Sequence, residues 1–586
     1  MRSNLGNLSR RLSTVTSRQT VRNGWTCQSC RVSQARRKLF STTTALREAK
    51  GDAIDKPYYV TTPIFYVNAS PHVGHLYSML IADILKRWQV LKGRPAILST
   101  GTDEHGMKVQ QAAQAQDIQP KALCDTNSET FRDLAKKANI DYDFFIRTTD
   151  AEHKEAVEYF WGRLKESGYI YETTHEGWYC VSDETYYPET MIKKRVSPLT
   201  GKSFMASVET GNKVEWQSEQ NYHFRLTAFK DRLLKLYADN PEFVVPKTRL
   251  AEVVNWVTNN LEDLSISRPR SRLEWGIPVP DDPEQVIYVW VDALINYITV
   301  AGYPMWPPGS EHTKGWPADV HVVGKDIVRF HSIYWPALLM ALDLPLPKTV
   351  LSHGHWLMSK KKMSKSVGNV VNPFFAIDRW GVDTIRYFLI YHGSITEDSD
   401  YSNEFIVINY KKGLQHSIGN LLNRITQPKQ WSVRDAVVEI CGKPSDELPD
   451  LVISQKQMIE ELVSKVEKHM DALNPTLALK AIIDVAFASN VFMSNAKPWD
   501  VKNESETTAL NQIVFHTSEA LRVVGILLQP FIPEKSKRLL DVLGVSPDRR
   551  TFEFAKLHAD NDYGTSFVPI VKGAQGSLFP PLPVED

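Results

Sequence analysis

Residues 58–100 follow a pattern of strand, helix and strand, which restricts the fold of this chain more than any other feature. Residues 58–62 are rich in β-forming side chains and end at a proline, so they predict a first strand. Apolar residues recur at helical spacing over residues 74–90, and residues 96–100 predict a second, buried strand. Such a βαβ unit predicts a parallel sheet with ligands at the carboxyl edge of its strands.

The rest of the chain divides by its hydrophobic periodicity. Residues 172–280 interrupt the α/β rhythm with prolines, glycines, short strands and a helix around residues 229–237. The α/β pattern resumes with strand-like residues at 286–290 and 319–323. After about residue 401 strand signals nearly vanish, and long amphipathic segments predict an α-helical domain; they lie at residues 407–424, 451–473 and 476–494.

The sequence Pro71-His72-Val73-Gly74-His75 lies at the junction of the first strand and the helix. A helix N-terminus gathers unpaired N–H groups and the positive end of the helix dipole, so it favours phosphate. Two imidazoles at this place can donate hydrogen bonds to phosphate oxygens, and Gly74 lets a nucleotide approach the backbone closely. Structural histidines with the same spacing are common, so this motif does not decide the function alone.

A lysine-rich loop, Lys362-Met363-Ser364-Lys365-Ser366, follows much later in the chain. Such a loop can close over a triphosphate and neutralise the charge that builds on departing pyrophosphate. The alternative is a solvated basic loop, which is the ordinary explanation of a run of lysines. The motif therefore gains its meaning from its combination with the two histidines.

The HxGH motif and the KMSKS motif together resemble the signature of the class I aminoacyl-tRNA synthetases. Further segments are similar to the methionyl-tRNA synthetases in particular; they are residues 62–68, 101–106, 261–268, 288–297, 324–331 and 496–499. The similarity extends from about residue 58 to residue 499 and so covers most of the chain.

The resemblance implies an α/β fold, a Rossmann-type parallel sheet with an inserted connective domain, followed by an α-helical bundle that binds the anticodon. The expected divisions are a transit peptide at 1–47, the two halves of the Rossmann domain at 55–171 and 285–345, the connective insertion at 172–284, a linker fold with the KMSKS loop at 346–400, the helical domain at 401–560 and a C-terminal strap at 561–586.

The resemblance also implies a methionine pocket. Its lining would be Ile64, Tyr66, Trp290, Ala293, Leu294, Tyr297, Phe330, His331 and Trp335. A thioether is flexible and polarizable and pairs well with aromatic edges, and Asp103 would hold the α-ammonium group by a charge-assisted hydrogen bond. Plain core packing is the alternative for Trp290, Tyr297 and Trp335.

ATP with Mg²⁺ is the second expected ligand. The implied catalytic residues stabilise charge on the phosphates, and they are His72, His75, Lys362 and Lys365. Further ATP contacts implied by the resemblance are Gly74, Gly324, Lys325, Asp326, Met363, Ser364 and Ser366. The methionine carboxylate would attack the α-phosphate in line, so catalysis is mostly positioning and electrostatics and needs no side-chain nucleophile.

Homocysteine should enter the same pocket, because a missing methylene changes binding by only about 1–3 kcal/mol. The insertion is too short for a large editing domain. The family cyclises activated homocysteine within the synthetic site, and we carry this over as a hypothesis.

The insertion departs from the family in one place. Many relatives carry a zinc knuckle that begins Gly-x-Tyr-Cys-x-x-Cys, but this chain reads Gly177-Trp178-Tyr179-Cys180-Val181-Ser182-Asp183. Residues 198–201 contain no cysteine either. Tetrahedral structural zinc needs four ligands, so we expect no zinc and a knuckle held by packing.

In the helical domain, Asn420 and Arg424 are four residues apart and would share one helix face. By resemblance these residues and Trp499 contact the anticodon of tRNA(Met), initiator and elongator, with Trp499 stacking on an unstacked base. A buried core tryptophan is the alternative for Trp499. No further tRNA-binding domain is expected after residues 578–580, which favours a monomer.

The first 47 residues hold ten basic and no acidic side chains, interleaved with serine and threonine. This composition is typical of a mitochondrial transit peptide, so we expect the mitochondrial matrix; a basic arm that touches RNA is the alternative. Without these ten charges the formal net charge falls from +1 to −9, so RNA must bind to local basic patches.

No apolar run reaches the roughly 18 residues of a membrane helix, so we expect no membrane span. The sequence leaves two alternative functions to consider. One is another class I synthetase: the valine, isoleucine and leucine enzymes need longer editing insertions, and the cysteine enzyme needs zinc ligands. The other is a catalytically inactive tRNA-binding protein, against which the intact histidines and lysines of the two motifs argue.

Overall fold

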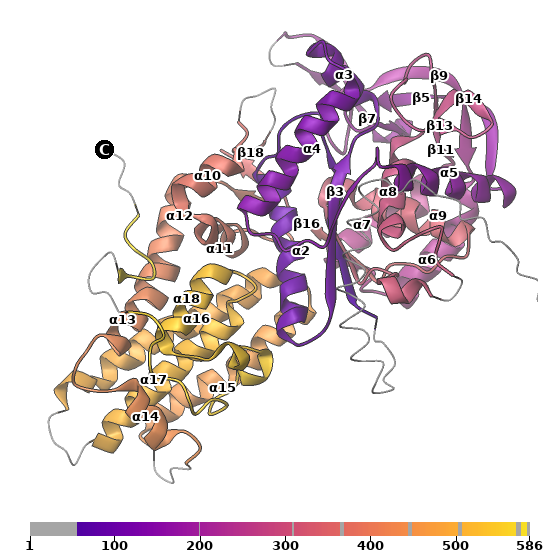
Figure 1. Cartoon of the computed structure of the whole chain (residues 1–586). Coiled ribbons are helices and arrows are strands. Elements are labelled where there is room, and N and C mark those ends of the chain that lie inside the picture. The colour runs from indigo at the N-terminus through magenta and orange to yellow at the C-terminus, as the bar shows by residue number, and fades with distance from the viewer. Residues whose placement is uncertain are drawn as a thin grey trace, which may run out of the picture. The chain divides into compact units, whose positions relative to one another are not determined.

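The computed structural model describes residues 56–197, 200–307, 310–363, 369–443, 448–501, 507–569 and 576–582 (Figure 1). The expected transit peptide, residues 1–47, lies outside this range, as do Ser364, Lys365 and Ser366 of the KMSKS loop.

A seven-stranded sheet forms the centre of the catalytic part, in the order β10-β16-β15-β1-β3-β2, with β4 also paired to β3. All of its pairs are parallel. Its strands are β1 (Tyr58–Thr61), β2 (Phe65–Tyr66), β3 (Ala96–Asp103), β4 (Phe144–Arg147), β10 (Val244–Val245), β15 (Val320–Gly324) and β16 (Thr349–His353). The predicted strands at 58–62, 96–100 and 319–323 and the parallel sheet are confirmed.

One boundary in this sheet differs from the sequence prediction. The strand predicted at residues 96–100 continues as β3 through residues 101–103, whose polarity is typical of a turn. Gly101 pairs with Ile146 of β4, and Asp103 pairs with Tyr66 of β2. Flanking strands on both sides thus satisfy the backbone, and the polar side chains of Thr102 and Asp103 are buried. Local polarity predicted a turn where the neighbouring strands impose a strand.

Helices cover this sheet (Figure 1). The predicted helix at 74–90 is α2 (Val73–Leu91), which is buried along most of its length. The other helices of this part are α3 (Met107–Ala115), α4 (Pro120–Lys137), α5 (Ala151–Glu166), α6 (Lys230–Asp239), α7 (Lys247–Asn260), α8 (Val289–Val300) and α9 (Trp335–Ala341).

The insertion builds antiparallel sheets. The first contains β5 (Ile170–Cys180), β6 (Thr185–Tyr187), β9 (Glu215–Phe224) and β11 (Leu264–Ser265); the second contains β12 (Ser267–Pro269), β13 (Pro278–Val279) and β14 (Asp282–Ile287); and β7 (Ile192–Val196) pairs with β8 (Ser203–Ser207). Between them, β10 joins the large parallel sheet. Residues 172–284 therefore form antiparallel sheets of their own and add one strand to the parallel sheet.

The prediction that the strand-like residues 286–290 return the chain to the parallel sheet was wrong. β14 ends at Ile287 and pairs with β12 and β13, and α8 begins at Val289. The run is apolar throughout because α8 is buried on nearly all sides. A short apolar run does not distinguish a buried strand from a buried helix.

A small linker fold connects the sheet to the helical domain. Its strands and helices are β17 (Trp356–Met358), β18 (Lys361–Lys362), β19 (Ser399–Asp400), α10 (Pro373–Trp380) and α11 (Val382–His392). The KMSKS motif begins at the end of β18.

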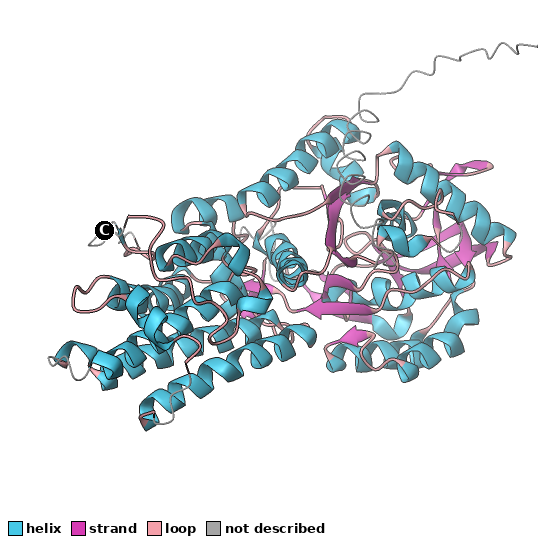
Figure 2. Cartoon of the chain, turned by 60° about the horizontal axis from the view of Figure 1, so that its bottom comes forward, coloured by secondary structure: helices cyan, strands magenta, loops and turns pink. Residues whose placement is uncertain are grey.

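The remaining helices form the predicted helical domain (Figure 2). They are α12 (Asn403–Asn409), a π-helix (Tyr410–Gly419), α13 (Asn420–Thr426), α14 (Val433–Ile440), α15 (Asp450–Asp471), α16 (Pro475–Ala496), α17 (Thr507–Leu527) and α18 (Pro533–Leu543). The three predicted helical segments are confirmed, the first as α-, π- and α-helix in succession. In the described part of the C-terminal strap, Phe579 is buried and the Tyr410 hydroxyl donates to Pro580 O at 2.6 Å.

One helix of the bundle is long and apolar enough to cross a membrane, although the sequence analysis found no such segment. This helix spans Pro475–Asp500, and 61% of its apolar stretch is buried inside the protein. α16, which forms most of it, packs against α15 and α17. A core helix of a bundle has the same apolar composition, and the absence of a membrane partner stays a prediction.

Candidate active site

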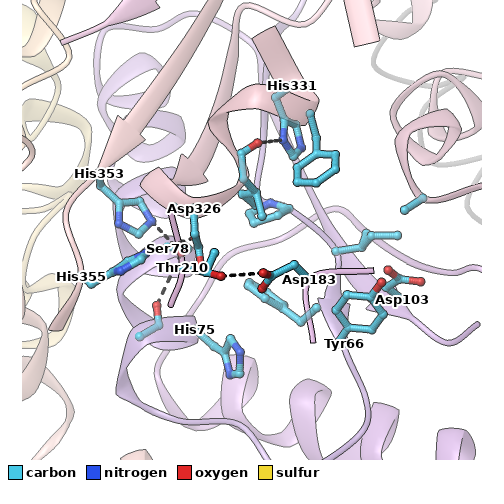
Figure 3. A pocket seen from close by; sticks show the side chains of 18 of the residues that line it. Tyr66, His75, Ser78, Asp103, Asp183, Thr210, Asp326, His331, His353 and His355 are labelled. Carbon is cyan, nitrogen blue, oxygen red and sulfur yellow. Dashed lines mark hydrogen bonds and ion pairs between the residues drawn. The ribbon is translucent and has the colours of Figure 1, made fainter. Parts of the chain in front are cut away.

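A pocket of about 290 Å³ opens at the carboxyl edge of the parallel sheet (Figure 3). The ends of β2, β3, β15 and β16 reach it, together with the N-termini of α2 and α8. This is the edge at which parallel α/β sheets bind ligands.

Two histidines begin α2. The backbone N–H of Gly74 donates to Nδ1 of His72 at 3.0 Å, and the backbone N–H of His72 donates to Nδ1 of His75 at 3.1 Å. The two rings stack with centroids 3.7 Å apart. Because Nδ1 accepts in each ring, a neutral ring carries its hydrogen on Nε2. The helix cap thus makes both Nε2 atoms hydrogen-bond donors.

Gly74 has a second reason to be glycine. A Cβ at this position would lie 2.8 Å from Cε1 of His72. The stacked pair of histidines therefore requires a residue without a side chain at position 74. This requirement is separate from the close approach of a nucleotide.

Asp103, at the end of β3, is a carboxylate in a buried place. It is 3% exposed, and its Oδ1 has no hydrogen-bond partner among the described residues. Burial raises the pKa of Asp103 well above its usual range, and the charges of Asp292 and Glu184 raise it further. A cation placed against Oδ1 would stabilise the ionised form. The hydroxyl of Tyr66, on the neighbouring strand, also lacks a partner among these residues.

An aromatic wall faces this carboxylate. Trp290 stacks on Phe330 with ring centroids 3.7 Å apart and 7° between the planes. Ala293 and Leu294, on the next turn of α8, continue the wall. Apolar and aromatic surfaces beside one buried acid suit a zwitterion with an apolar side chain.

His331 is held in one tautomer. Its Nδ1 donates to the carbonyl of Ile327 at 2.9 Å, so Nε2 accepts from the hydroxyl of Tyr297 at 2.6 Å. Burial lowers the pKa of His331 to about 4, which keeps the ring neutral. The pair therefore adds a polar but uncharged surface to the pocket.

The other end of the pocket follows β15 and β16. A Cβ on Gly324 would lie 2.8 Å from Oδ1 of Asp326, so the turn after β15 requires a small residue. Nε2 of His355 lies 3.1 Å from the same oxygen. Nδ1 of His353 donates to its neighbouring carbonyl, so its Nε2 accepts from the Ser78 hydroxyl at 2.8 Å.

Most of the sequence-predicted site residues lie together. Those that line the pocket are Ile64, Tyr66, His72, Gly74, His75, Asp103, Trp290, Ala293, Leu294, Tyr297, Gly324, Asp326, Phe330, His331 and Met363. Trp335 lies behind the wall, fully buried, with its ring 6.1 Å from Tyr297 and 5.9 Å from Trp316, which favours core packing. Lys325 forms an ion pair with Asp398 at 2.7 Å. The side chain of Lys362 lies outside the described part.

Several lining residues were missed by sequence reasoning. His353 and His355 follow the end of β16, so the rule that ligands meet the ends of parallel strands could have found them. Asp183 and Thr210 also line the pocket, in which their side chains meet (Figure 3). They belong to the insertion, and no sequence signal indicates that it reaches the pocket.

Asp183 occupies the place of the second cysteine in the knuckle pattern that the resemblance implies. Its Oδ2 accepts from Thr210 at 2.6 Å and from Tyr187 at 3.0 Å, and its Oδ1 accepts from Asn212 at 2.7 Å. Burial raises the pKa of Cys180 to about 12, which disfavours the thiolate that metals bind. No group of three or more His, Cys, Asp or Glu that could hold a metal occurs among the described residues.

The helical domain brings its three predicted residues together. Nδ2 of Asn420 donates to Oδ1 of Asn490 at 2.9 Å, and Nη1 of Arg424 donates to Asn490 O at 3.1 Å. The Arg424 guanidinium lies 5.3 Å from the ring centroid of Trp499. Trp499 is 41% exposed, so it is not a buried core tryptophan.

Comparisons with known proteins agree with both parts of this geometry. Residues 58–426 match the family model of class I tRNA synthetases (M), and residues 450–570 match the anticodon-binding domain of methionyl tRNA ligase. The chain belongs to the class I methionyl-tRNA synthetases.

Similar proteins cover nearly the whole length. A Neurospora crassa protein named probable mitochondrial methionine–tRNA ligase is 56% identical over 97% of this chain and 92% of its own. The human mitochondrial methionine–tRNA ligase is 42% identical over 86% of each chain. The Mycobacterium tuberculosis methionyl-tRNA synthetase in complex with methionyl-adenylate is 38% identical, with a TM-score of 0.81 over 90% of this chain and 100% of that one.

Proposed function

We propose that this methionine–tRNA ligase activates methionine with ATP in the pocket of Figure 3 and transfers it to tRNA(Met) in mitochondria. The observation that carries the proposal is the meeting of three features in one pocket: the donor histidines of α2, the aromatic wall, and Oδ1 of Asp103, which has no hydrogen-bond partner within the described part of the chain. The bound methionyl-adenylate of the bacterial neighbour supports the same assignment.

The α-ammonium group of methionine binds the carboxylate of Asp103. Its charge compensates the buried carboxylate, and a charge-assisted hydrogen bond satisfies Oδ1. The thioether side chain lies against Trp290, Ala293 and Leu294, where the sulfur contacts aromatic edges. The neutral His331–Tyr297 pair closes this end.

ATP binds between the N-terminus of α2 and the ends of β15 and β16. The Nε2 donors of His72 and His75 contact its phosphates, and Lys362 and Lys365 neutralise the leaving pyrophosphate. Gly324, Asp326 and Met363 border the nucleotide, and the resemblance adds Ser364 and Ser366 of the KMSKS loop as contacts. Mg²⁺ travels with the phosphates, as is usual for this ion, instead of occupying a protein cage.

The methionine carboxylate oxygen attacks the α-phosphorus of ATP. A new P–O bond forms, the bond to the bridging β-oxygen breaks, and pyrophosphate leaves with that electron pair. Both reactants are held in place, so positioning supplies much of the rate enhancement. A hydroxyl of the terminal tRNA adenosine then attacks the methionyl carbonyl and releases AMP.

Asn420, Arg424 and Trp499 form the proposed anticodon site. An exposed tryptophan with an arginine 5.3 Å from its ring centroid offers a stacking platform for an unstacked base. We further propose that the substrates include initiator and elongator tRNA(Met) and that the enzyme is a monomer of the mitochondrial matrix. We also propose that it cyclises activated homocysteine.

The proposal is tested by charging of tRNA. The chain should attach radiolabelled methionine to a tRNA transcript with a CAU anticodon, and much less to the same transcript with an altered anticodon. The proposal would be contradicted if the chain charged neither transcript with methionine but attached another amino acid to another tRNA.

A further inference from the structure

Three buried side chains beneath the pocket form a network that the proposed chemistry does not use. Oδ2 of Asp292 lies 2.6 Å from Nδ1 of His105, and its Oδ1 lies 2.8 Å from Nε2 of His153. All three residues are at most 2% exposed. Burial acts to raise the pKa of Asp292, but the two histidines hold it at about 2. The group is therefore a carboxylate that accepts from both imidazoles.

The three residues come from three elements. His105 follows β3, two positions after Asp103. Asp292 belongs to the first turn of α8, and His153 belongs to α5. Nδ1 of His153 also lies 3.2 Å from Oγ1 of Thr299, near the other end of α8. Thus α8 is fastened to α5 at two places and to the end of β3 at its start.

The turn after Asp103 is fixed on its other sides as well. The Glu104 carboxylate accepts from Arg147 at 2.6 and 2.9 Å, and its carbonyl accepts from Nε1 of Trp275 at 2.5 Å. The His105–Asp292 bond is a direct link from this rigid turn to α8.

We propose that His105 and Asp292 are positioning residues that set the separation between the carboxylate of Asp103 and the apolar wall on α8. The inference rests on the proposed function, in which the ammonium end of methionine binds Asp103 and its side chain binds the apolar wall. Ala293 and Leu294 directly follow Asp292, so a shift of the first turn of α8 would displace the wall. A ligand held at both ends loses affinity when its two supports move apart. ATP is bordered by α2, β15 and β16, so its affinity should not depend on this bond.

The test compares two variants of the full chain in methionine-dependent ATP–pyrophosphate exchange. His105→Leu removes the donor, whereas His105→Asn keeps an amide donor near the place of Nδ1. We expect His105→Leu to raise the KM for methionine roughly tenfold or more, with the KM for ATP changed less than about twofold. His105→Asn should stay within about threefold of the unaltered protein for both.

A matched control separates positioning from general loss of a buried ion pair. Asp560 is 1% exposed and pairs with Arg549 at 2.6 Å in the C-terminal part. Asp560→Asn should leave both KM values unchanged. If His105→Leu does not fold, Asp292→Asn, which keeps the shape and one acceptor oxygen, should show the same selective rise.

Equal changes of both KM values in His105→Leu would overturn the inference, as would equal impairment of His105→Asn and His105→Leu. Exchange by the unaltered protein with an amino acid other than methionine would instead overturn the proposed function, so the two failures are distinguishable.

Discussion

Burial and the charges of Asp292 and Glu184 raise the pKa of Asp103 in the ligand-free protein. A folded-state pKa above the unfolded value means that the protonated carboxyl favours folding. That contribution is fully present below the unfolded pKa and is lost as the pH rises through the raised folded pKa. At neutral pH, Asp103 therefore lowers the stability of the folded protein, and in the proposed complex the ammonium group of methionine compensates its charge.

Asp103→Asn should separate activity from stability. The variant loses the charge-assisted bond to the substrate, roughly 1.5–3 kcal/mol, so kcat/KM for methionine should fall about 10- to 150-fold. Its melting temperature at pH 7 should rise, because the buried charge is gone. Exchange kinetics and thermal unfolding followed by circular dichroism measure both. Unchanged kinetics together with a lower melting temperature would contradict this role.

At the same scale, sequence reasoning reached the residues that motifs mark and missed those that only packing brings together. His72 and His75 stand at a recognisable helix start, and the family resemblance marks Asp103, so these residues could be found in the sequence. His105 and Asp292 lie far apart in the sequence, and their bond depends on how α8 packs on the end of β3.

Among the elements, the knuckle formed by residues 180–188 and 207–214 is held together by hydrogen bonds of Asp183. Asp183 connects its two loops through bonds to Thr210 and Asn212. Asp183→Ala should leave these donors without their partner and raise cleavage by a protease in this segment several-fold, while Asp548→Ala, on the exposed C-terminal part, should not. The absence of zinc stays a prediction, and stoichiometric zinc in the purified protein by elemental analysis would contradict it.

The proposed anticodon site, Asn420, Arg424 and Trp499, lies at the junction of α13, α16 and the 3-10 helix Pro498–Asp500. Trp499→Ala should lower kcat/KM for tRNA(Met) charging by about 5- to 150-fold, the range of roughly 1–3 kcal/mol per stacked base. Exchange without tRNA should be unchanged. Trp216→Ala is a matched control, since Trp216 is 53% exposed but lies in the insertion. Equal effects of the two substitutions on charging would contradict a specific platform.

Elements differ in how well periodicity predicts them. The βαβ unit and the long helices of the bundle were predictable because their apolar residues recur with a regular period. The end of β14 and the start of α8 were not separated, since both are apolar and only Tyr288 lies between them. The approach of the insertion to the pocket is a tertiary contact without a local signal.

For the whole molecule, a buried arginine connects the catalytic part to the helical domain. Arg386 of α11 is 1% exposed and donates to Asp83 of α2 at 2.6 Å. It also donates to the backbone carbonyl oxygens of Ala138, Asn139, Pro530 and Phe531. One side chain thus joins the HxGH helix, the linker fold and the turn before α18.

Arg386→Met should remove this connection and leave the Asp83 charge with Arg87 as its remaining ion-pair partner. Breaking a buried pair by removing one partner costs about 3–5 kcal/mol. The midpoint of unfolding in urea should fall accordingly, whereas Arg434→Met, which loses a partly exposed ion pair with Asp562 and bonds to the carbonyl oxygens of Asn561 and Tyr563, should lower it less. Similar midpoints for the two variants would contradict the proposed role of Arg386.

ATP–pyrophosphate exchange with each of the twenty amino acids tests the central claim most directly, because it measures adenylate formation in the pocket alone. We expect exchange with methionine and not with the other nineteen. In Lys365→Ala, which removes a charge from the KMSKS loop, the exchange rate with methionine should fall at least about 100-fold. Exchange driven by another amino acid, or methionine exchange that survives in Lys365→Ala at the unaltered rate, would contradict it.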